Sequence, residues 1–560
     1  MSELPSYKPI WPETVIFWGA GATRALNIHT TNELGQAIYL LAENGRSLMA
    51  RVTAGFSRES VISGVSDLLI ILGDDDDGRA DFPTPAQTQA LTRQFPLLSE
   101  DERKKRGREL RNTYDWGTLR QVVHVCPGHD ARSFKLQDLF NLLDMHIQSR
   151  HGFYVYSSDG AGQRFVPAEA LAVARNALVM LIGLLHFFDY QKALQQNNDI
   201  LQQYISFAEI LAGLMQEEGS RFYQQGHGIH RRQFYLFSYA LISMNWDPIM
   251  LWLIFNAHKK ANRSQLAPCI EDPAVPLKMF YDLSCFMGVR PVDSPEINVW
   301  YPFNESVVQR TNNTGHVVSR RVRLGKIYFP HGCSSWRECP SCGKLTMYLG
   351  NEWRYASPSL FPPPLLPGFT DSWRKPGSHE ELVAHKMGMA DVVQCVHCGT
   401  LTELKHTPLV MQSNFKAGYA PFLEEIQRDM RVALENAEHV VLMGYTIPAD
   451  DVIYRSLLSA RQKRGRAPYC SVIVGKQQEA PDCWLKGAEL KEYLKKSGPQ
   501  SAFTKAVQSA QEIFAEDQVR GYACGIPRVF IDNRNEASYR KVKELLYPRE
   551  RFSDNKVSRF

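Results

Sequence analysis

The chain lacks any long hydrophobic run. Its longest apolar stretch, "ALVMLIGLLHFF" (177–188), is interrupted by His186 and is too short for the roughly 20 residues of a membrane-spanning helix. The first residues, "MSELPSYKPIWPETV", have no basic segment followed by an apolar one, which excludes a typical secretory signal. We therefore expect a cytoplasmic protein with no membrane partner, and we interpret 177–188 as a helix of the protein core.

An excess of charge of one sign is also missing. The 560 residues carry 64 Lys and Arg against 59 Asp and Glu, which gives a net charge of +5. So small an excess neither requires a polyanionic partner nor excludes one, and direct binding to nucleic acid is not indicated. The sequence shows no internal repeat, and its length exceeds what one simple core accommodates.

The cysteines do not suggest a disulfide framework, because their number, 11, is odd and nothing indicates secretion. Four of them form two C-x-x-C-G motifs, "ECPSCGKL" and "QCVHCGT". Cys339, Cys342, Cys395 and Cys398 can supply four thiolates to one tetrahedral Zn²⁺, and the glycine after each pair permits the tight turn. Four sulfurs leave no position open for a substrate, so we predict a structural zinc. Redox-active or incidental cysteines are the alternative.

A glycine is missing from an otherwise familiar pattern near the start of the chain. In "TVIFWGAGATRALNIHTTNEL" (14–34), an apolar strand runs directly into Gly19, Ala20 and Gly21. Such a strand and turn are typical of a site that holds a phosphorylated ligand at the next helix. A dinucleotide-binding dehydrogenase has a third glycine where this chain has Arg24. The segment therefore predicts a nucleotide-binding fold of another kind.

Polar side chains follow a second apolar strand. In "SMNWDP" (243–248), Asn245 and Asp247 come directly after the strand residues "YALI". Two residues apart on a strand, an amide and a carboxylate point to the same side, which suits binding of a ribose or an amide. An Asx turn at the strand end is the alternative interpretation.

Two further strands end in segments that suit a ligand site. "IYFPHGC" (327–333) carries His331 at the carboxyl end of a strand, where open α/β sheets bind ligands, although a lone histidine is more often a core or surface residue. "HVVLMGYTIPADD" (439–451) is a buried strand followed by a second glycine turn. As the second nucleotide-facing loop of the same sheet, this turn is expected.

The predicted fold is α/β, a Rossmann-like parallel sheet split by a helical insertion and a zinc-binding module. Apolar residues at helical spacing predict the insertion, and alternating strands and helices near the end, "RVFID" (528–532) among the strands, predict parallel βαβ units. We expect the helical insertion and the long loop of the zinc module to mediate self-association or docking of a partner. The predicted divisions are 1–85 for the first part of the sheet domain, 86–235 for the helical insertion, 236–332 for the continuation with Asn245 and His331, 333–405 for the zinc module, and 406–560 for the second half of the sheet domain.

The order of these motifs resembles that of the sirtuin superfamily. Sirtuins bind NAD with a Gly-Ala-Gly turn that does not follow the dehydrogenase spacing. Their Gln-Asn-Ile-Asp segment resembles "SMNWD", their catalytic His-Gly resembles His331-Gly332, and the zinc knuckles follow it as they do here. The resemblance implies NAD as substrate, a zinc ion, and a set of site residues. It places Gly19, Ala20, Gly21 and Thr23 at the NAD phosphates and ribose, Asn245 and Asp247 at the nicotinamide riboside, His331 as the base, and Gly444, Tyr445 and Thr446 on the adenosine side.

The departures from the protein deacylases of this superfamily separate possible functions. Deacylases follow the glycine turn with Pro-Asp-Phe-Arg, where this chain has His29-Thr30-Thr31-Asn32, and Met244 replaces their Gln. Their peptide-pairing Phe-Gly-Glu segment is replaced by "PLVMQSNFK". "GYTIPADDVIYRSLL" (444–458) is instead similar to a loop of sirtuin-like proteins from bacterial anti-phage systems, which destroy NAD.

The sequence therefore predicts an NAD⁺ hydrolase that releases nicotinamide and ADP-ribose as an anti-phage effector. An NAD-dependent protein deacylase and a non-catalytic NAD-binding regulatory subunit are the alternatives. The resemblance also implies a homo-oligomer and an activating companion protein, such as an ATPase or an Argonaute-like protein.

Overall fold

The computed structural model describes most of the chain outside its middle third and its ends. The statements below concern these residues. They are 13–43, 59–73, 82–156, 162–196, 198–224, 235–251, 323–334, 421–448, 451–462, 468–475 and 480–548, with short pieces between 253 and 410 and residue 477.

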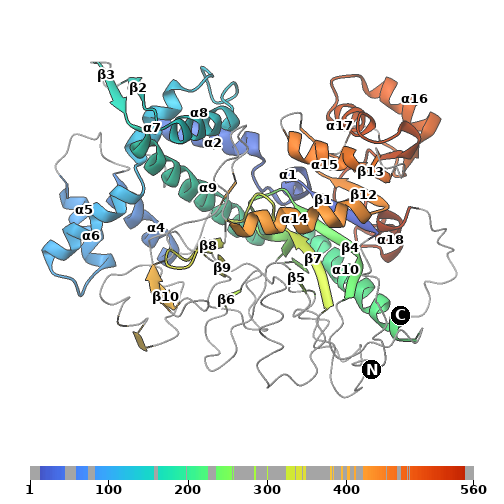
Figure 1. Cartoon of the computed structure of the whole chain (residues 1–560), viewed down its shortest axis with the longest axis horizontal. Coiled ribbons are helices and arrows are strands. Elements are labelled where there is room, and N and C mark those ends of the chain that lie inside the picture. Colours follow the sequence, from blue (N-terminus) through green and yellow to red (C-terminus); the bar gives the residue numbers. More distant parts are fainter. Residues whose placement is uncertain are drawn as a thin grey trace, which may run out of the picture.

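A large parallel sheet organises one part of the molecule (Figure 1). The order of its eight strands is β14-β15-β13-β12-β1-β4-β7-β5, and every neighbouring pair is parallel except the edge pair β14 and β15. The predicted α/β class and mostly parallel sheet are therefore confirmed. The strands are β1 (Thr14–Trp18), β4 (Tyr235–Ser243), β5 (Leu283–Ser284), β7 (Arg323–Tyr328), β12 (His439–Met443), β13 (Tyr469–Ile473), β14 (Leu485–Lys486) and β15 (Val519–Tyr522).

Strand β1 lies at the centre of this sheet, between β12 and β4. Its apolar residues are buried, as expected for a strand covered on both faces. Trp18, the last residue of β1, is paired with Met443 of β12 and with Ser243 of β4. The three strands thus end at the same level, and the segments that follow them meet at one edge.

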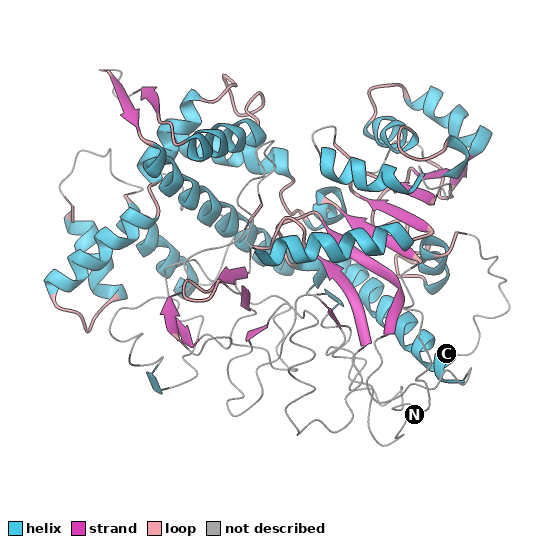
Figure 2. Ribbon diagram, in the orientation of Figure 1, coloured by secondary structure: helices cyan, strands magenta, loops and turns pink. Residues whose placement is uncertain are grey.

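Helices cover both faces of the sheet (Figure 2). Helices α10 and α18 contact each other, as do α14 and α15, and the two pairs lie on opposite faces. This two-sided covering is the arrangement expected of a parallel sheet. The helices of this part are α10 (Asn198–Gln224), α14 (Pro421–Asn436), α15 (Val452–Gln462), α16 (Gly487–Ser497), α17 (Ala502–Gln511) and α18 (Tyr539–Leu546).

A helical unit with its own hydrophobic core lies beside the sheet. The sequence assigned the segment before residue 85 to the sheet domain, yet α2 and α4 bury their apolar faces in this helical core. Conversely, α10 was assigned to the helical insertion and packs on the sheet. The unit contains α2 (Thr31–Glu43), α4 (Glu59–Leu72), α5 (Pro85–Gln94), α6 (Glu100–Thr113), α7 (Trp116–Val125), α8 (Leu136–Ser149), α9 (Ala168–Gln196) and the hairpin of β2 (Phe153–Tyr156) and β3 (Gln163–Val166).

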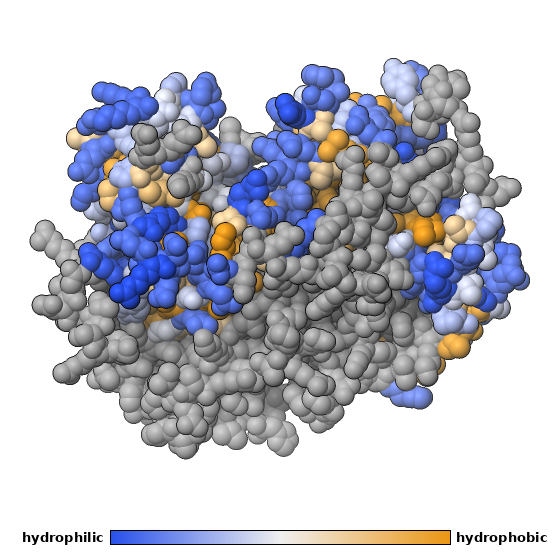
Figure 3. All heavy atoms as spheres, turned by 180° about the vertical axis from the view of Figure 1, so that it is seen from behind, coloured by the Kyte–Doolittle hydropathy of each residue, from blue (hydrophilic) through white to orange (hydrophobic). Residues whose placement is uncertain are grey.

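Helix α9 contains the apolar stretch that the sequence suggested as a core helix. By length and hydropathy, its segment Ala168–His186 is the one candidate membrane span among the described helices, and 61% of the tested window is buried inside the protein. On the face seen in Figure 3, hydrophilic residues predominate over the described surface. The helix is thus mostly covered by protein.

The prediction of a strand at "RVFID" is wrong. These residues form turns after β15, which ends at Tyr522, and Gly525 accepts a hydrogen bond from the backbone of Val529. The turn still buries Val529 and Phe530, and the ring of Phe530 stacks on Phe207 of α10. The apolar pattern therefore marked a buried segment correctly. Apart from an isolated antiparallel bridge between Ile531 and Ala537, its side chains are buried by packing between the loop and helix α10.

Candidate functional site

The glycine turns that follow β1 and β12 are packed against each other. The amide of Gly19 donates to the carbonyl of Met443 (2.9 Å), and the amide of Gly21 donates to that of Gly444 (3.0 Å). A Cβ atom on Gly444 would lie 2.0 Å from the amide nitrogen of Ala22, and Gly444 has a φ of +65°. The three glycines are therefore required by the close approach of two backbone segments.

The other residues predicted on the nucleotide side have different surroundings. Ala20 begins the short helix α1 (Ala20–Thr23), and the buried Thr23 hydroxyl donates to the Ala20 carbonyl (3.2 Å). The ring of Tyr445 is buried and stacks on Phe17, with 5.5 Å between ring centroids. Thr446 is exposed. Tyr445 thus contributes to the core, whereas Thr446 faces solvent.

Asn245 and Asp247 lie just beyond the end of β4. The Asn245 amide is 3.5 Å from the Thr23 hydroxyl, and Asp247 accepts a hydrogen bond from the backbone of Ile249 (3.1 Å), so the Asx turn is formed. Burial raises the pKa of Asp247 to about 7, and the negative charge of Asp189 also raises it. The hydrogen bonds from Ile249 and Asn245 lower the pKa but do not outweigh burial. A carboxyl group that titrates near neutrality is typical of acid–base sites.

His331 follows β7 and is 1% exposed. Its Nδ1 atom lies 3.2 Å from the carbonyl oxygen of Met244. Because a carbonyl only accepts, Nδ1 carries the proton, and in the neutral ring Nε2 has the basic lone pair. The ring also makes an edge contact with Tyr454 of α15, with 5.3 Å between centroids. His331 is therefore held in the tautomer that a general base needs.

Backbone hydrogen bonds join these segments into one structure. The amide of Met244 donates to the carbonyl of Trp18 at the end of β1 (2.9 Å), and the amide of Ser334 donates to the carbonyl of Trp246 (2.8 Å). The segment that holds Asn245 thus lies between the glycine turn and the loop of His331. The ring of Trp246 packs in the helical core, against Phe140.

We expect Asp247→Asn to stabilise the protein in a pH-dependent manner. Burial raises the pKa of the carboxyl group from 3.8 to about 7, so ionisation opposes folding. Between pH 3.8 and about pH 7, the free energy of unfolding of the wild type falls relative to that of the variant by up to roughly 1.4 kcal/mol per pH unit. Above the folded-state pKa it falls no further. Asparagine keeps the oxygen that accepts from Ile249. Denaturant unfolding should show the variant more stable by a few kcal/mol at about pH 8 and by much less at about pH 5. An equal difference at both pH values would contradict the buried, protonated carboxyl group.

The structure adds two residues that the sequence did not suggest as part of the site. Nδ1 of His29 lies 2.7 Å from each carboxylate oxygen of Asp189. Asp189 belongs to α9, where the buried His186 lies one turn earlier. In the sequence, His186 and Asp189 stand out as polar residues in an apolar helix, but no local pattern indicates that His29 is the partner of Asp189.

Of the predicted zinc ligands, Cys339 and Cys342 are described, and Cys395 and Cys398 lie outside the described residues. Cys339 is buried, and its carbonyl accepts from the amide of Gly343 (2.8 Å), which has a φ of +65°. This turn joins the antiparallel strands β8 (Trp336–Glu338) and β9 (Leu345–Tyr348), and the second motif lies between the antiparallel strands β10 (Val392–Gln394) and β11 (Leu401–Glu403). The first turn fits a zinc knuckle. No cluster of three potential ligands occurs within the described part of the chain.

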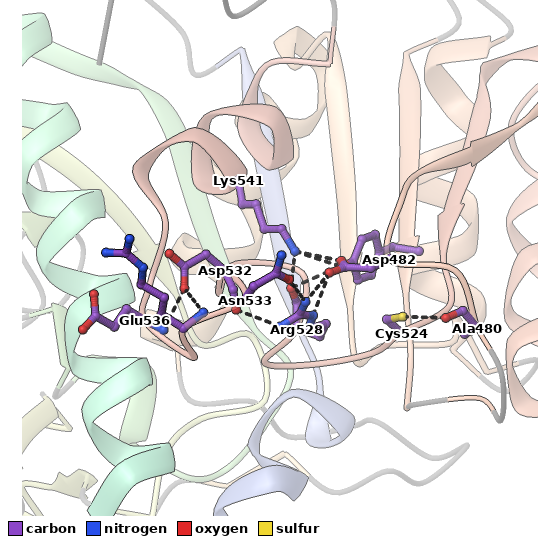
Figure 4. A network of polar contacts seen from close by, with 10 residues as sticks. Ala480, Asp482, Cys524, Arg528, Asp532, Asn533, Glu536 and Lys541 are labelled. Carbon is purple, nitrogen blue, oxygen red and sulfur yellow. Dashed lines mark hydrogen bonds and ion pairs between the residues drawn. The ribbon is translucent and has the colours of Figure 1, made fainter. Parts of the chain in front are cut away.

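Farther along the same sheet, a polar network fixes the loop after β15 (Figure 4). Asp482 accepts from Arg528 and from Lys541 of α18, each at 2.7 Å. Burial acts against ionisation, but these cations and the hydroxyl of Tyr522 hold the pKa of Asp482 below its ordinary value. Arg528 also donates to the carbonyl of Asp532 (2.7 Å). The network accounts for the order of this loop.

The candidate site thus consists of the segments that follow β1, β4, β7 and β12. They come from four distant parts of the chain, and hydrogen bonds connect them directly. The helical unit borders them through α9 and Trp246. No protein-family model matches the chain, and a search of curated proteins finds no match.

Proposed function

We propose that the protein is an NAD⁺ hydrolase that cleaves the bond between nicotinamide and ribose. The observation that supports this function best is the convergence of the motifs on one sheet edge. Asn245 contacts Thr23 of the glycine turn, and the neighbouring Met244 carbonyl orients His331. Segments chosen from the sequence for their likeness to the NAD-binding elements of sirtuins are therefore neighbours in space.

The reaction follows from the groups at this edge. The bond from C1′ of the ribose to the nicotinamide nitrogen breaks, and its electron pair leaves with nicotinamide through an oxocarbenium-like state, as in glycoside hydrolysis. A water molecule forms the new bond to C1′ and loses its proton to Nε2 of His331, directly or through a ribose hydroxyl. NAD⁺ and water thus give nicotinamide, ADP-ribose and a proton.

The roles of the neighbouring residues follow from their chemistry. The Asn245 amide can both donate and accept, which suits positioning of the water and of the ribose hydroxyls. Asp247 closes the turn that follows Asn245 and accepts a hydrogen bond from the Asn245 side chain, and it is uncharged for part of the time near neutrality. Asn245, Asp247 and His331 are 7%, 3% and 1% exposed, so bulk water is largely excluded.

The features that distinguish the chain from deacylases favour water over an acyl-lysine as the nucleophile. His29 begins the segment that replaces Pro-Asp-Phe-Arg, and Met244 replaces the glutamine. We further propose a role as an anti-phage effector that depletes NAD, based on the likeness of 444–458 to the bacterial sirtuin-like proteins. Self-association and an activating ATPase or Argonaute-like partner belong to the same proposal.

We also propose that one zinc ion per chain joins the two knuckles through Cys339, Cys342, Cys395 and Cys398. The ion would cross-link the two C-x-x-C segments and take no part in the chemistry. Elemental analysis of the natively purified protein is expected to find one zinc per chain, and Cys339→Ser should lower this content and destabilise the module. Cys483→Ser, at an exposed cysteine, is the matched control. Absence of stoichiometric zinc from the wild type would refute the proposal.

Nicotinamide release from NAD⁺, in the absence of any acylated peptide, tests the proposed activity. The assay uses the full chain, alone and with the product of the neighbouring gene. Release that needs an acetylated peptide would indicate a deacylase. Tight NAD binding without any product would indicate a regulatory subunit.

A further inference from the structure

The loop after the glycine turn carries a histidine that the helical unit holds in place. Asn27 has a left-handed backbone (φ 60°) and donates to the carbonyl of Arg24 (3.0 Å), which reverses the chain direction. Two residues later, the amide of His29 donates to Asp189 (3.1 Å), and its Nδ1 lies 2.7 Å from both carboxylate oxygens. Asp189 is 4% exposed, so this contact is fixed within the protein.

The orientation of the His29 ring follows from this contact. A carboxylate only accepts, so Nδ1 of His29 donates its proton and Nε2 lies on the opposite edge of the ring. The side chain is 33% exposed. Burial lowers the pKa of His29, but the hydrogen bond and the charge of Asp189 outweigh it and raise the pKa above its ordinary value. His29 is thus a partly accessible cation over a wider pH range than a free histidine.

Two further cations and two carboxylates lie around His29. Lys192, one turn beyond the partner carboxylate on α9, is close enough to oppose protonation of His29, and Glu33 of α2 favours it. Arg24 forms an ion pair with Glu33 (2.7 Å). His186, one turn earlier on α9, is buried with a pKa lowered to about 4, so it is neutral at physiological pH. Three cationic groups therefore face two carboxylates.

This cluster borders the candidate site. Trp246, which lies between Asn245 and Asp247, packs in the same hydrophobic core as α9, so α9 lies near the turn that carries Asn245. The loop of His29 continues directly from α1, whose Thr23 contacts Asn245. In nucleotide-binding sheets, the phosphates lie at the turn after the first strand, whereas here the reacting groups lie beyond β4 and β7.

We propose that His29 binds the diphosphate of the nucleotide as a cation, and that Asp189 of the helical unit is its positioning residue. This inference rests on the proposed function only in that a nucleotide diphosphate occupies the site. A cation on the phosphate side suits a ligand with two negative charges, and pairing with Asp189 fixes the ring before the ligand arrives.

Calorimetric titration of the full chain with ADP-ribose, between about pH 6 and about pH 9, tests the proposal. The diphosphate stays ionised over this range, so any change in affinity reflects the protein. The wild type should bind more weakly as the pH rises through the pKa of His29. Because the Asp247 carboxyl group also titrates near pH 7, the variants are compared in an Asp247→Asn background. There, His29→Gln should bind about 10-fold to 100-fold more weakly at low pH and lose this dependence. His29→Lys should keep its affinity to higher pH, and Asp189→Asn should move the dependence to lower pH.

Two controls separate phosphate binding from a structural role. Adenosine has no phosphate, so its affinity should be the same in the wild type and in His29→Gln. Asp144→Asn removes another ion pair of α9, between Asp144 and Arg175 (2.8 Å), and should leave ADP-ribose binding unchanged.

The proposal is overturned if the wild type binds ADP-ribose with the same affinity at every pH or does not bind it at all. It is also overturned if His29→Gln weakens adenosine and ADP-ribose equally. Nicotinamide release decides the hydrolase proposal separately. A protein that binds ADP-ribose as expected but never cleaves NAD⁺ would retain this inference and lose the other.

Discussion

Asn245→Ala and His331→Asn are each expected to lower nicotinamide release about 10²-fold to 10⁴-fold, the usual cost of losing a positioning or acid–base group. Asparagine at position 331 keeps an N–H donor for the carbonyl of Met244, which His331 contacts at 3.2 Å, but it has no basic nitrogen in place of Nε2. Asn245→Ala removes a long hydrogen bond to Thr23 and the hydrogen bond to Asp247, whose carboxyl group still accepts from Ile249, and it adds no bulk. Both variants should therefore fold.

Two variants remove the same chemical groups from exposed positions. His129 lies in a loop and Asn436 at the end of α14, both away from the sheet edge. His129→Ala and Asn436→Ala should therefore release nicotinamide at the wild-type rate. Circular dichroism and thermal unfolding check the fold of each variant. Wild-type nicotinamide release by His331→Asn or Asn245→Ala, under activating conditions, would show that the site is assigned to the wrong residues.

The elements of the sheet were predictable because each has a local sequence pattern. A continuous apolar run marks a strand buried on both faces, and a glycine directly after it marks a tight turn. These patterns located β1, β4, β7 and β12, and the parallel arrangement then required the segments that follow them to meet at one edge. The pattern also predicted a strand at 528–532, where buried side chains instead pack from a series of turns.

Contacts between distant segments could not be predicted in the same way. The partner of His29 is Asp189, 160 positions later, and no spacing rule connects a loop to a helix at that distance. The apolar periodicity of the helical insertion indicates only which face of a helix is buried, so it does not predict that Asp189 contacts the His29 loop. The contact became evident only once α2 and α9 were seen to share a core with Trp246.

This shared core has a mechanical consequence. The segments on both sides of the candidate site, α2 after the glycine turn and Trp246 between Asn245 and Asp247, have their buried groups in the helical core. A displacement of the helical unit would therefore move the His29 loop and the Asn245 turn together. This coupling offers a physical route by which self-association through the helices could alter the site.

The glycines of the two turns are required by backbone contact between segments more than 400 residues apart in the chain. We expect Gly444→Ala to abolish stable folding or to lower the free energy of unfolding by several kcal/mol, in the upper range for single substitutions. The new Cβ would lie 2.0 Å from the amide nitrogen of Ala22 and 2.4 Å from the carbonyl carbon of Gly21, and these backbone atoms of α1 cannot move aside as a flexible side chain does. The φ of +65° adds a further strain for any residue with a Cβ.

Gly475→Ala is the matched control for this prediction. Gly475 follows β13, the strand next to β12, but a Cβ there meets nothing within 4 Å, so alanine should change stability by less than about 1 kcal/mol. Chemical denaturation of the two variants measures the difference. If Gly444→Ala were as stable as Gly475→Ala, the two turns would not be in backbone contact. A glycine at position 444 would then be required only for ligand binding. A large loss at Gly444 with little at Gly475 would mean that the two glycine turns hold the segments after β1 and β12 together, and that the candidate site is built on this contact.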